Sequence, residues 1–98
     1  MYIIKFSKRA EKDMELLKKA GLERKAKGLL NIIRVNPLQT PPSVEKLLWD
    51  LRGCFSRRIN AKHRLVYEIL DNTENFLAPD GSPYDGVVRV VQMWTHYE

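Results

Sequence analysis

The chain has 98 residues, of which 44% are hydrophobic, and this predicts one small globular domain over residues 1–98. Its one cysteine excludes an internal disulfide, and one thiol with two histidines makes a metal site unfavourable, so no metal and no cofactor is expected. No apolar run suits a signal peptide or a membrane span, so we expect a cytoplasmic protein without membrane contact.

The net charge of +5 is unevenly distributed along the chain. Residues 51–67 carry cations and no acid: Arg52, Arg57, Arg58, Lys62 and Arg64. Residues 71–86 carry acids and no Lys or Arg: Asp71, Glu74, Asp80 and Asp85. The basic block indicates either a surface for a polyanion such as nucleic acid or a solvated basic face, and charge alone leaves both interpretations open.

The N-terminal part predicts a strand followed by two helices. Residues 2–6 are rich in β-branched and aromatic types, which favours a strand, and Ser7 is placed to cap the next helix. Apolar residues then recur at helical spacing over 10–17 and again over 22–33. A proline-rich connector follows at 37–43. The two helices are expected to form a hairpin.

Three strands are predicted in the C-terminal half, over 54–59, 63–70 and 87–94. A tight turn at 60–62 joins the first two, and the acidic segment 71–86 joins the last two. Consecutive strands with short connections favour an antiparallel meander. The predicted class is therefore α+β, in the order β-α-α-β-β-β, with an antiparallel sheet packed against a two-helix hairpin.

Antiparallel pairing of the last two strands would place Arg64 and His96 at the same end of the sheet, opposite the acidic segment. A metal-free ribonuclease needs a base for the ribose 2′-hydroxyl, an acid for the departing 5′-oxygen, and a cation for the charge that develops on phosphorus. His96 suits the acid and Arg64 suits the cation. Spacing alone does not choose the base among Glu45, Asp50 and His63.

The strongest motifs lie between Glu45 and Tyr67 and at the last residues. Leu-x-Gly-x-x-Ser-Arg-Arg-Ile occupies 51–59, His-Arg-Leu-Val-Tyr occupies 63–67, and His-Tyr occupies 96–97. In these motifs, in size and in its β-α-α beginning, the chain resembles the YoeB/Txe toxins of the RelE/ParE superfamily. The resemblance implies a RelE-like fold of the microbial ribonuclease type and an mRNA interferase of a type II toxin–antitoxin system.

The resemblance also implies residue roles. Glu45 falls on the general base, Arg64 on the transition-state arginine, His96 on the general acid, and Tyr97 on the tyrosine that shapes the site. RNA contacts are implied for three basic residues, Lys46, Arg57 and Arg58. Because Arg57 and Arg58 alternate in a strand, at most one should face the site, and the other is expected in solvent.

The implied reaction is metal-independent cleavage of mRNA in the ribosomal A site, by attack of the 2′-hydroxyl to give a cyclic phosphate. The implied partners are mRNA, the ribosome with its RNA, and a YefM-like antitoxin, with operator DNA reached only through the antitoxin. A free monomer and a homodimer both stay open. The rival hypotheses are a non-catalytic co-repressor that binds its antitoxin, and a ParE-like toxin that acts on gyrase. Glu98 and the long acidic segment depart from the family pattern.

Overall fold

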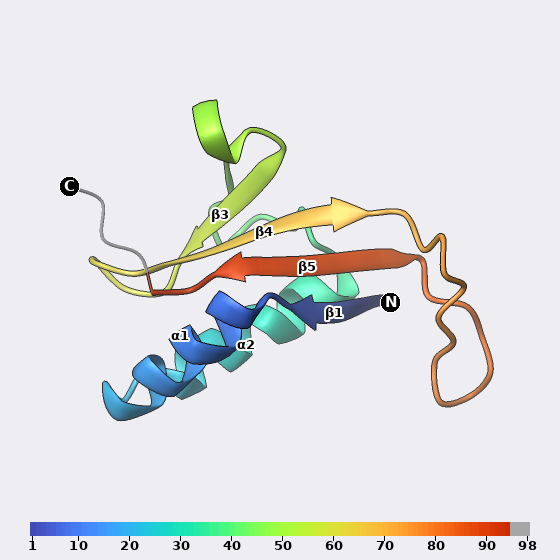
Figure 1. Ribbon diagram of the computed structural model, residues 1–98, viewed down its shortest axis with the longest axis horizontal. Coiled ribbons are helices and arrows are strands. Elements are labelled where there is room, and N and C mark those ends of the chain that lie inside the picture. Colours follow the sequence, from blue (N-terminus) through green and yellow to red (C-terminus); the bar gives the residue numbers. More distant parts are fainter. Residues whose placement is uncertain (95–98) are drawn as a thin grey trace.

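The computed structural model describes residues 1–94, which form a five-stranded sheet with two helices on one face (Figure 1). The elements in chain order are β1 (Tyr2–Phe6), α1 (Lys8–Lys19), α2 (Glu23–Val35), β2 (Glu45–Lys46), a 3₁₀ helix η1 (Trp49–Leu51), β3 (Cys54–Arg58), β4 (Arg64–Leu70) and β5 (Gly86–Gln92). In the sheet the strands lie in the order β1-β5-β4-β3-β2. The predicted α+β class, the helical hairpin and the antiparallel β3-β4-β5 meander are confirmed.

The two edge strands refine the predicted arrangement. β1 pairs with β5 in parallel, from Tyr2 opposite Gly86 to Phe6 opposite Val90, so the sheet is mixed rather than wholly antiparallel. The other edge strand, β2, has only two residues, which is too short for alternation to appear in the sequence. Neither β1 nor β2 is joined to the strand it pairs with by a short hairpin turn. The sequence therefore gives no local signal for these two pairings.

Local chemistry sets the start of α1 and the turn between the two helices. The Ser7 hydroxyl accepts a hydrogen bond from the Ala10 amide at 3.0 Å, which caps α1, and it donates to the Val91 carbonyl at 2.7 Å. One side chain therefore fixes the start of α1 against the end of β5. Gly21, between the helices, has a φ of 75°, a conformation that a side chain would oppose.

The hydrophobic core lies between the helices and the face of the sheet that they cover. Its buried residues come from both helices, from β4 and β5 and from the segments beside them: Ala10, Leu17, Ala26, Leu30, Ile33, Ile59, Leu65, Tyr67, Val88, Val90 and Met93. Burial of each large aliphatic side chain contributes about 1.5–3 kcal/mol. The opposite face of the sheet is covered by neither α1 nor α2 in Figure 1 and is called the open face below. No helix within residues 1–94 is long and apolar enough to cross a membrane.

The two ends of the meander are clearly separated. The turn between β3 and β4 is held by the Asn60 side-chain oxygen, which accepts from the amides of Lys62 and His63 at 2.9 and 2.7 Å. The acidic segment extends beyond the other end of β4 and β5 (Figure 1). His96, Tyr97 and Glu98 lie outside the residues that the structure describes.

Candidate active site

Three neighbouring strands bring the predicted base and the predicted cation to one face. In an extended strand alternate side chains point to opposite faces, so Ser56 and Arg58 share the open face of β3. Glu45 of β2 lies opposite Ser56, and Arg64 of β4 lies opposite Arg58. The register of the β2-β3-β4 ladder therefore gathers one acid, one hydroxyl and two guanidinium groups.

The contact at the centre of this group joins Glu45 to Arg64. The Glu45 Oε2 atom lies 3.5 Å from the Arg64 Nη1 atom, and the same nitrogen lies 3.4 Å from the Ser56 hydroxyl oxygen, to which it donates. The Arg64 side chain is 20% exposed and that of Glu45 is 59% exposed. A pair this open to water contributes little to stability, so its importance lies in the placement of the two groups.

Two small hollows adjoin this contact. One, of about 330 Å³, is lined by Pro42, Ser43, Glu45, Ser56, Arg58 and Arg64. The other, of about 310 Å³, is lined by Glu45, Leu47, Ser56 and Arg64. Volumes of this size are at the lower end of those that hold small ligands in proteins. A carboxylate and two arginines thus border a space open to a ligand, which we call the site pocket.

The structure separates the three predicted RNA-contact residues. Arg58 lines the site pocket as predicted for one of the adjacent arginines. Lys46 is exposed but lies opposite Phe55, and alternation puts it on the other face from Glu45. It lines neither hollow, so its contact with RNA stays a prediction.

Arg57 corrects the expectation that the second arginine contacts RNA or solvent. Its exposed fraction is 0%, and it points to the covered face, away from the site pocket. Its Nε atom donates to the Tyr67 hydroxyl at 3.0 Å, while its other nitrogens donate to carbonyl groups of the 37–43 connector. These buried acceptors explain why a guanidinium occupies a core position.

The structure distinguishes the three acid–base candidates that the sequence left open. His63 is buried and its ring stacks on Trp94, with ring centroids 3.9 Å apart. Asp50 is exposed in η1 and borders neither hollow of the site pocket. Of the three, Glu45 alone lines the pocket and contacts Arg64.

The predicted residues His96 and Tyr97 lie outside the described part of the chain, so their place beside Arg64 stays a prediction. The described chain ends at Trp94, whose ring stacks on His63, the neighbour of Arg64. The amides of Met93 and Trp94 donate to the Asp13 carboxylate at 2.9 and 3.1 Å. The C-terminal segment therefore leaves the described structure at the Arg64 end of the sheet.

Two residues at this end were not singled out from the sequence. Ser56 belongs to the Ser-Arg-Arg-Ile motif, and its position two residues before Arg58 places it on the same face. Asp13 is 5% exposed and lies on the face of α1 that carries the buried apolar residues. An acid at a core position of a helix is unusual, and this could have marked Asp13 in the sequence.

Cys54, at the start of β3, is the free thiol of the chain. Burial, followed by the nearby Glu68 carboxylate, raises the pKa of the Cys54 thiol above its ordinary value. A thiol with a raised pKa stays protonated near neutral pH and makes a weak nucleophile. Cys54 lines neither hollow of the site pocket and is therefore a poor candidate for a nucleophile there.

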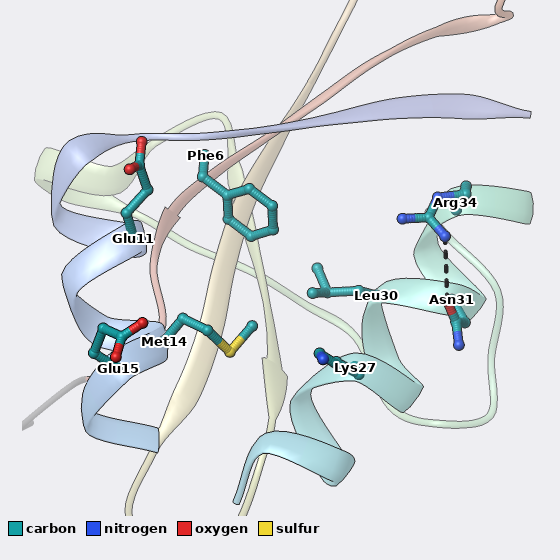
Figure 2. A pocket seen from close by; sticks show the side chains of 8 residues that line it. All are labelled: Phe6, Glu11, Met14, Glu15, Lys27, Leu30, Asn31 and Arg34. Atoms are coloured by element: carbon teal, nitrogen blue, oxygen red, sulfur yellow. Dashed lines mark hydrogen bonds between the residues drawn. The ribbon is translucent and has the colours of Figure 1, made fainter. Parts of the chain in front are cut away.

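A larger hollow, of about 530 Å³, lies elsewhere, between α1, α2 and the end of β1 (Figure 2). Phe6, Met14 and Leu30 form its apolar part. Acids of α1 stand on one side and cations of α2 on the other: Glu11, Glu15, Lys27 and Arg34. Neither Glu45 nor Arg64, the two predicted catalytic residues that the structure describes, lines it, so its size does not make it the candidate active site.

Comparisons with known proteins identify the family of the chain. A family model described as a YoeB-like toxin of bacterial type II toxin–antitoxin systems matches residues 6–80. Toxin YoeB of a Synechocystis strain is 39% identical over 61 residues, which cover 62% of this chain and 64% of that protein. The match therefore spans slightly less than two thirds of the length of this relative.

Solved structures match over nearly the whole chain. YoeB in the heterotetrameric YoeB–YefM complex from Staphylococcus aureus is 29% identical, with 99% of both chains covered and a TM-score of 0.71. The YoeB dimer from the same organism is 29% identical, with 98% of both chains covered and a TM-score of 0.69. A YoeB/ParE toxin from Agrobacterium tumefaciens shares the fold, at 24% identity and a TM-score of 0.76 over 97% of this chain and 99% of that one.

Proposed function

This chain belongs to the family of YoeB-like toxins of bacterial type II toxin–antitoxin systems, and on that premise we propose that it is a ribosome-dependent endoribonuclease. It cuts mRNA in the ribosomal A site and thereby stops translation. The observation that supports this most directly is the Glu45–Arg64 contact of 3.5 Å at the edge of the site pocket. A carboxylate and a guanidinium held side by side are the base and the cation that RNA cleavage needs.

The proposed reaction uses Glu45 and Arg64 together with His96, which lies outside the described residues. Glu45 takes the proton from the ribose 2′-hydroxyl, and the 2′-oxygen attacks the adjacent phosphorus. The bond from phosphorus to the 5′-oxygen breaks, and His96 gives its proton to that oxygen. The products are a 2′,3′-cyclic phosphate and a free 5′-hydroxyl, so atoms and charges balance without a metal ion or another cofactor.

Arg64 and Arg58 supply the positive charge for the phosphorane-like transition state. Arg64 is largely covered and donates to Ser56, which limits the directions that its guanidinium can take. A donor fixed before the reaction stabilises developing charge without having to reorganise. Arg58 lines the same pocket and contributes a second phosphate contact. Tyr97 orients the RNA beside His96, and Lys46 contacts the RNA backbone farther out.

The partners follow from the family. Staphylococcus aureus YoeB forms a heterotetrameric complex with YefM and also a dimer. We accordingly propose three partners for this toxin: a YefM-like antitoxin, the ribosome and its mRNA. Operator DNA is contacted only through the antitoxin, and the free toxin forms a homodimer. The place of action is the cytoplasm, where translating ribosomes are found.

Purified protein added to a defined translation reaction tests this function. The mRNA should be cut within the codon in the A site, and both new ends should be analysed. A cyclic phosphate on the 3′ end with a hydroxyl on the 5′ end is expected. A 5′-phosphate would contradict the metal-independent reaction. Intact mRNA, together with tight binding to antitoxin and operator, would favour the non-catalytic co-repressor instead.

A further inference from the structure

The buried arginine of β3 carries an inference beyond the groups that touch RNA. Arg57 is fully buried, and its hydrogen-bond partners are one hydroxyl and three carbonyl oxygens. The Tyr67 hydroxyl accepts from Arg57 Nε at 3.0 Å and donates to the Pro37 carbonyl at 2.6 Å. Arg57 Nη2 donates to that same carbonyl at 3.1 Å, so the three residues close a small ring of hydrogen bonds.

The remaining donors of Arg57 extend along the connector. Nη2 also donates to the Gln39 carbonyl at 2.8 Å, and Nη1 donates to the Pro42 carbonyl at 2.9 Å. A guanidinium offers five N–H groups in a rigid plane, a geometry that a lysine cannot reproduce. One side chain thus holds the start, the middle and the end of the 37–42 segment, and we call this arrangement the connector clamp.

The clamped segment leads directly into the site pocket. Pro42 and Ser43 line the pocket, and Glu45 follows in β2. β2 is only two residues long and is paired through Glu45–Ser56 and Lys46–Phe55. A strand as short as β2 makes few backbone hydrogen bonds, so strand pairing alone holds the Glu45 side chain weakly. The position of Glu45 therefore depends on the segment before it.

The clamp also joins both sides of the pocket to one strand. Arg57 stands between Ser56 and Arg58, which point to the opposite face and line the pocket. The same strand thus presents the groups beside Arg64 and, through its covered face, holds the connector that carries Glu45.

Burial raises the pKa of the Tyr67 hydroxyl, even though the hydrogen bond and the charge of the Arg57 guanidinium act to lower it. Tyr67 therefore keeps the proton that it donates to Pro37.

We propose that Arg57, supported by Tyr67, is a positioning residue for RNA cleavage, and that the connector clamp sets Glu45 opposite Arg64. This inference rests on the proposed function. Reacting groups must be placed closely, and a misplacement of about 1 Å can cost ~10²-fold in rate. Ribosome binding, by contrast, depends on the exposed cations around the site pocket, such as Arg58, which the clamp does not touch.

Single-turnover cleavage of ribosome-bound mRNA tests the clamp in Arg57→Met, Arg57→Lys and Tyr67→Phe. Rates are expressed per folded molecule, with the folded fraction taken from thermal melts. Arg57→Met should lose ~10- to 10²-fold in rate at saturating ribosome, with the half-saturating ribosome concentration changed by less than about 2-fold. Arg57→Lys should regain part of the rate, and Tyr67→Phe should lose less. Lys25→Met, which removes an exposed cation from α2, is the matched control and should cut like wild type.

Hydrogen exchange gives a second readout that needs no activity. In Arg57→Met, amides of residues 38–47 should exchange faster, while those of β4 and β5 stay protected. A merely structural arginine would lower the melting temperature without changing the rate per folded molecule, and that outcome would overturn the inference. If Arg57→Met does not fold, Arg57→Lys and Tyr67→Phe decide by the same criterion. Wild-type protein that leaves mRNA intact would refute the proposed function, and with it any role of the clamp in cleavage, whatever exchange shows.

Discussion

The two ends of the sheet are built in different ways. At the site end, Glu45, Arg58 and Arg64 come from three strands, and their arrangement depends on the pairing of those strands. At the other end, the acidic segment is held mainly by itself. The Asn72 side chain donates to the carbonyls of Phe76 and Tyr84 and accepts from the Phe76 amide. Strand pairing therefore sets the site, whereas hydrogen bonds within the acidic segment set most of the shape of that segment.

The two ends also differ in charge. Arg58 and Arg64 stand at the site end, while the acidic segment carries Asp71, Glu74, Asp80 and Asp85. Near the acidic end, the N-terminal amine pairs with Asp85 at 2.5 Å and Lys5 lies 4.3 Å from the centre of the Phe76 ring. RNA phosphate is attracted by the first end and repelled by the exposed acids of the second. The substrate should therefore approach from the site end.

Removal of the proposed base should lower the cleavage rate more than any other change at the site end. Glu45→Gln keeps the size of the side chain but cannot accept the 2′-hydroxyl proton, so cleavage should fall by ~10²-fold or more. Cleavage of ribosome-bound mRNA under single-turnover conditions measures this. The matched control is Asp50→Asn, which changes an exposed acid five residues away that borders neither hollow. Equal losses in the two variants would show that the base has been wrongly assigned.

Arg64→Ala should lose ~10²-fold in cleavage rate, the usual scale for one lost group that stabilises transition-state charge. Arg64 is not a member of the helix-packed core, so folding and antitoxin binding should persist. Circular dichroism and an antitoxin pull-down check both. Arg52→Ala, which removes an exposed arginine before β3, provides the control for loss of charge alone. A near wild-type rate in Arg64→Ala would refute its role.

The sequence predicted the fold well where one element carries its own signal. Helical spacing, the Ser7 cap and the turn at Asn60 act within a few residues, so α1, α2 and the β3–β4 hairpin could be found. The parallel β1–β5 pairing joins residues about 84 apart in the chain and leaves no local trace. The same limit explains Arg57: alternation showed that it faces away from Arg58, but its connector carbonyls appear only in the folded chain.

The candidate site was predictable mainly through motifs. Spacing placed Arg64 at the correct end of the sheet but left Glu45, Asp50 and His63 equivalent as bases. Resemblance to a toxin family selected Glu45, and the structure then placed it 3.5 Å from Arg64. Ser56 was missed because a serine next to two arginines gives no chemical signal of its own until the strand register is known.

A smaller effect at the site end is expected from Asp13→Ala. Its carboxylate accepts from two amides, of Met93 and Trp94, and a buried amide without an acceptor costs about 1–3 kcal/mol. The melting temperature should fall, and cleavage should fall more than the folded fraction does, because Met93 and Trp94, which precede His96 in the chain, lose their anchor. Thermal melts and cleavage rates on the same samples measure this. Glu15→Ala, an exposed acid on the same helix, should change neither; equal melting temperatures for the two variants would contradict the anchor.

The smallest effect on cleavage is expected at the other end of the sheet. Residues 71–86 can be replaced by Asn-Gly, because Leu70 and Val87 are already paired and a two-residue turn suits such a hairpin. The replaced segment begins beyond Leu70, about 20 Å from Arg64 at ~3.3 Å per residue of β4. Groups so far apart, without shared partners, act independently. The cleavage rate per folded molecule should therefore stay within about 3-fold of wild type.

The same variant separates two uses of the acidic segment. If the segment serves a partner, the short turn should weaken antitoxin binding or change the oligomeric state while cleavage persists. A second variant, Glu74→Gln with Asp80→Asn, keeps the length and removes exposed charge, so it tells whether charge or shape is recognised. Loss of the pair between Asp85 and the N-terminal amine should matter little, because both groups are more than half exposed. A shortened protein that folds, binds antitoxin and yet leaves mRNA intact would show that the two ends are coupled and that the site depends on more than the strands that carry it.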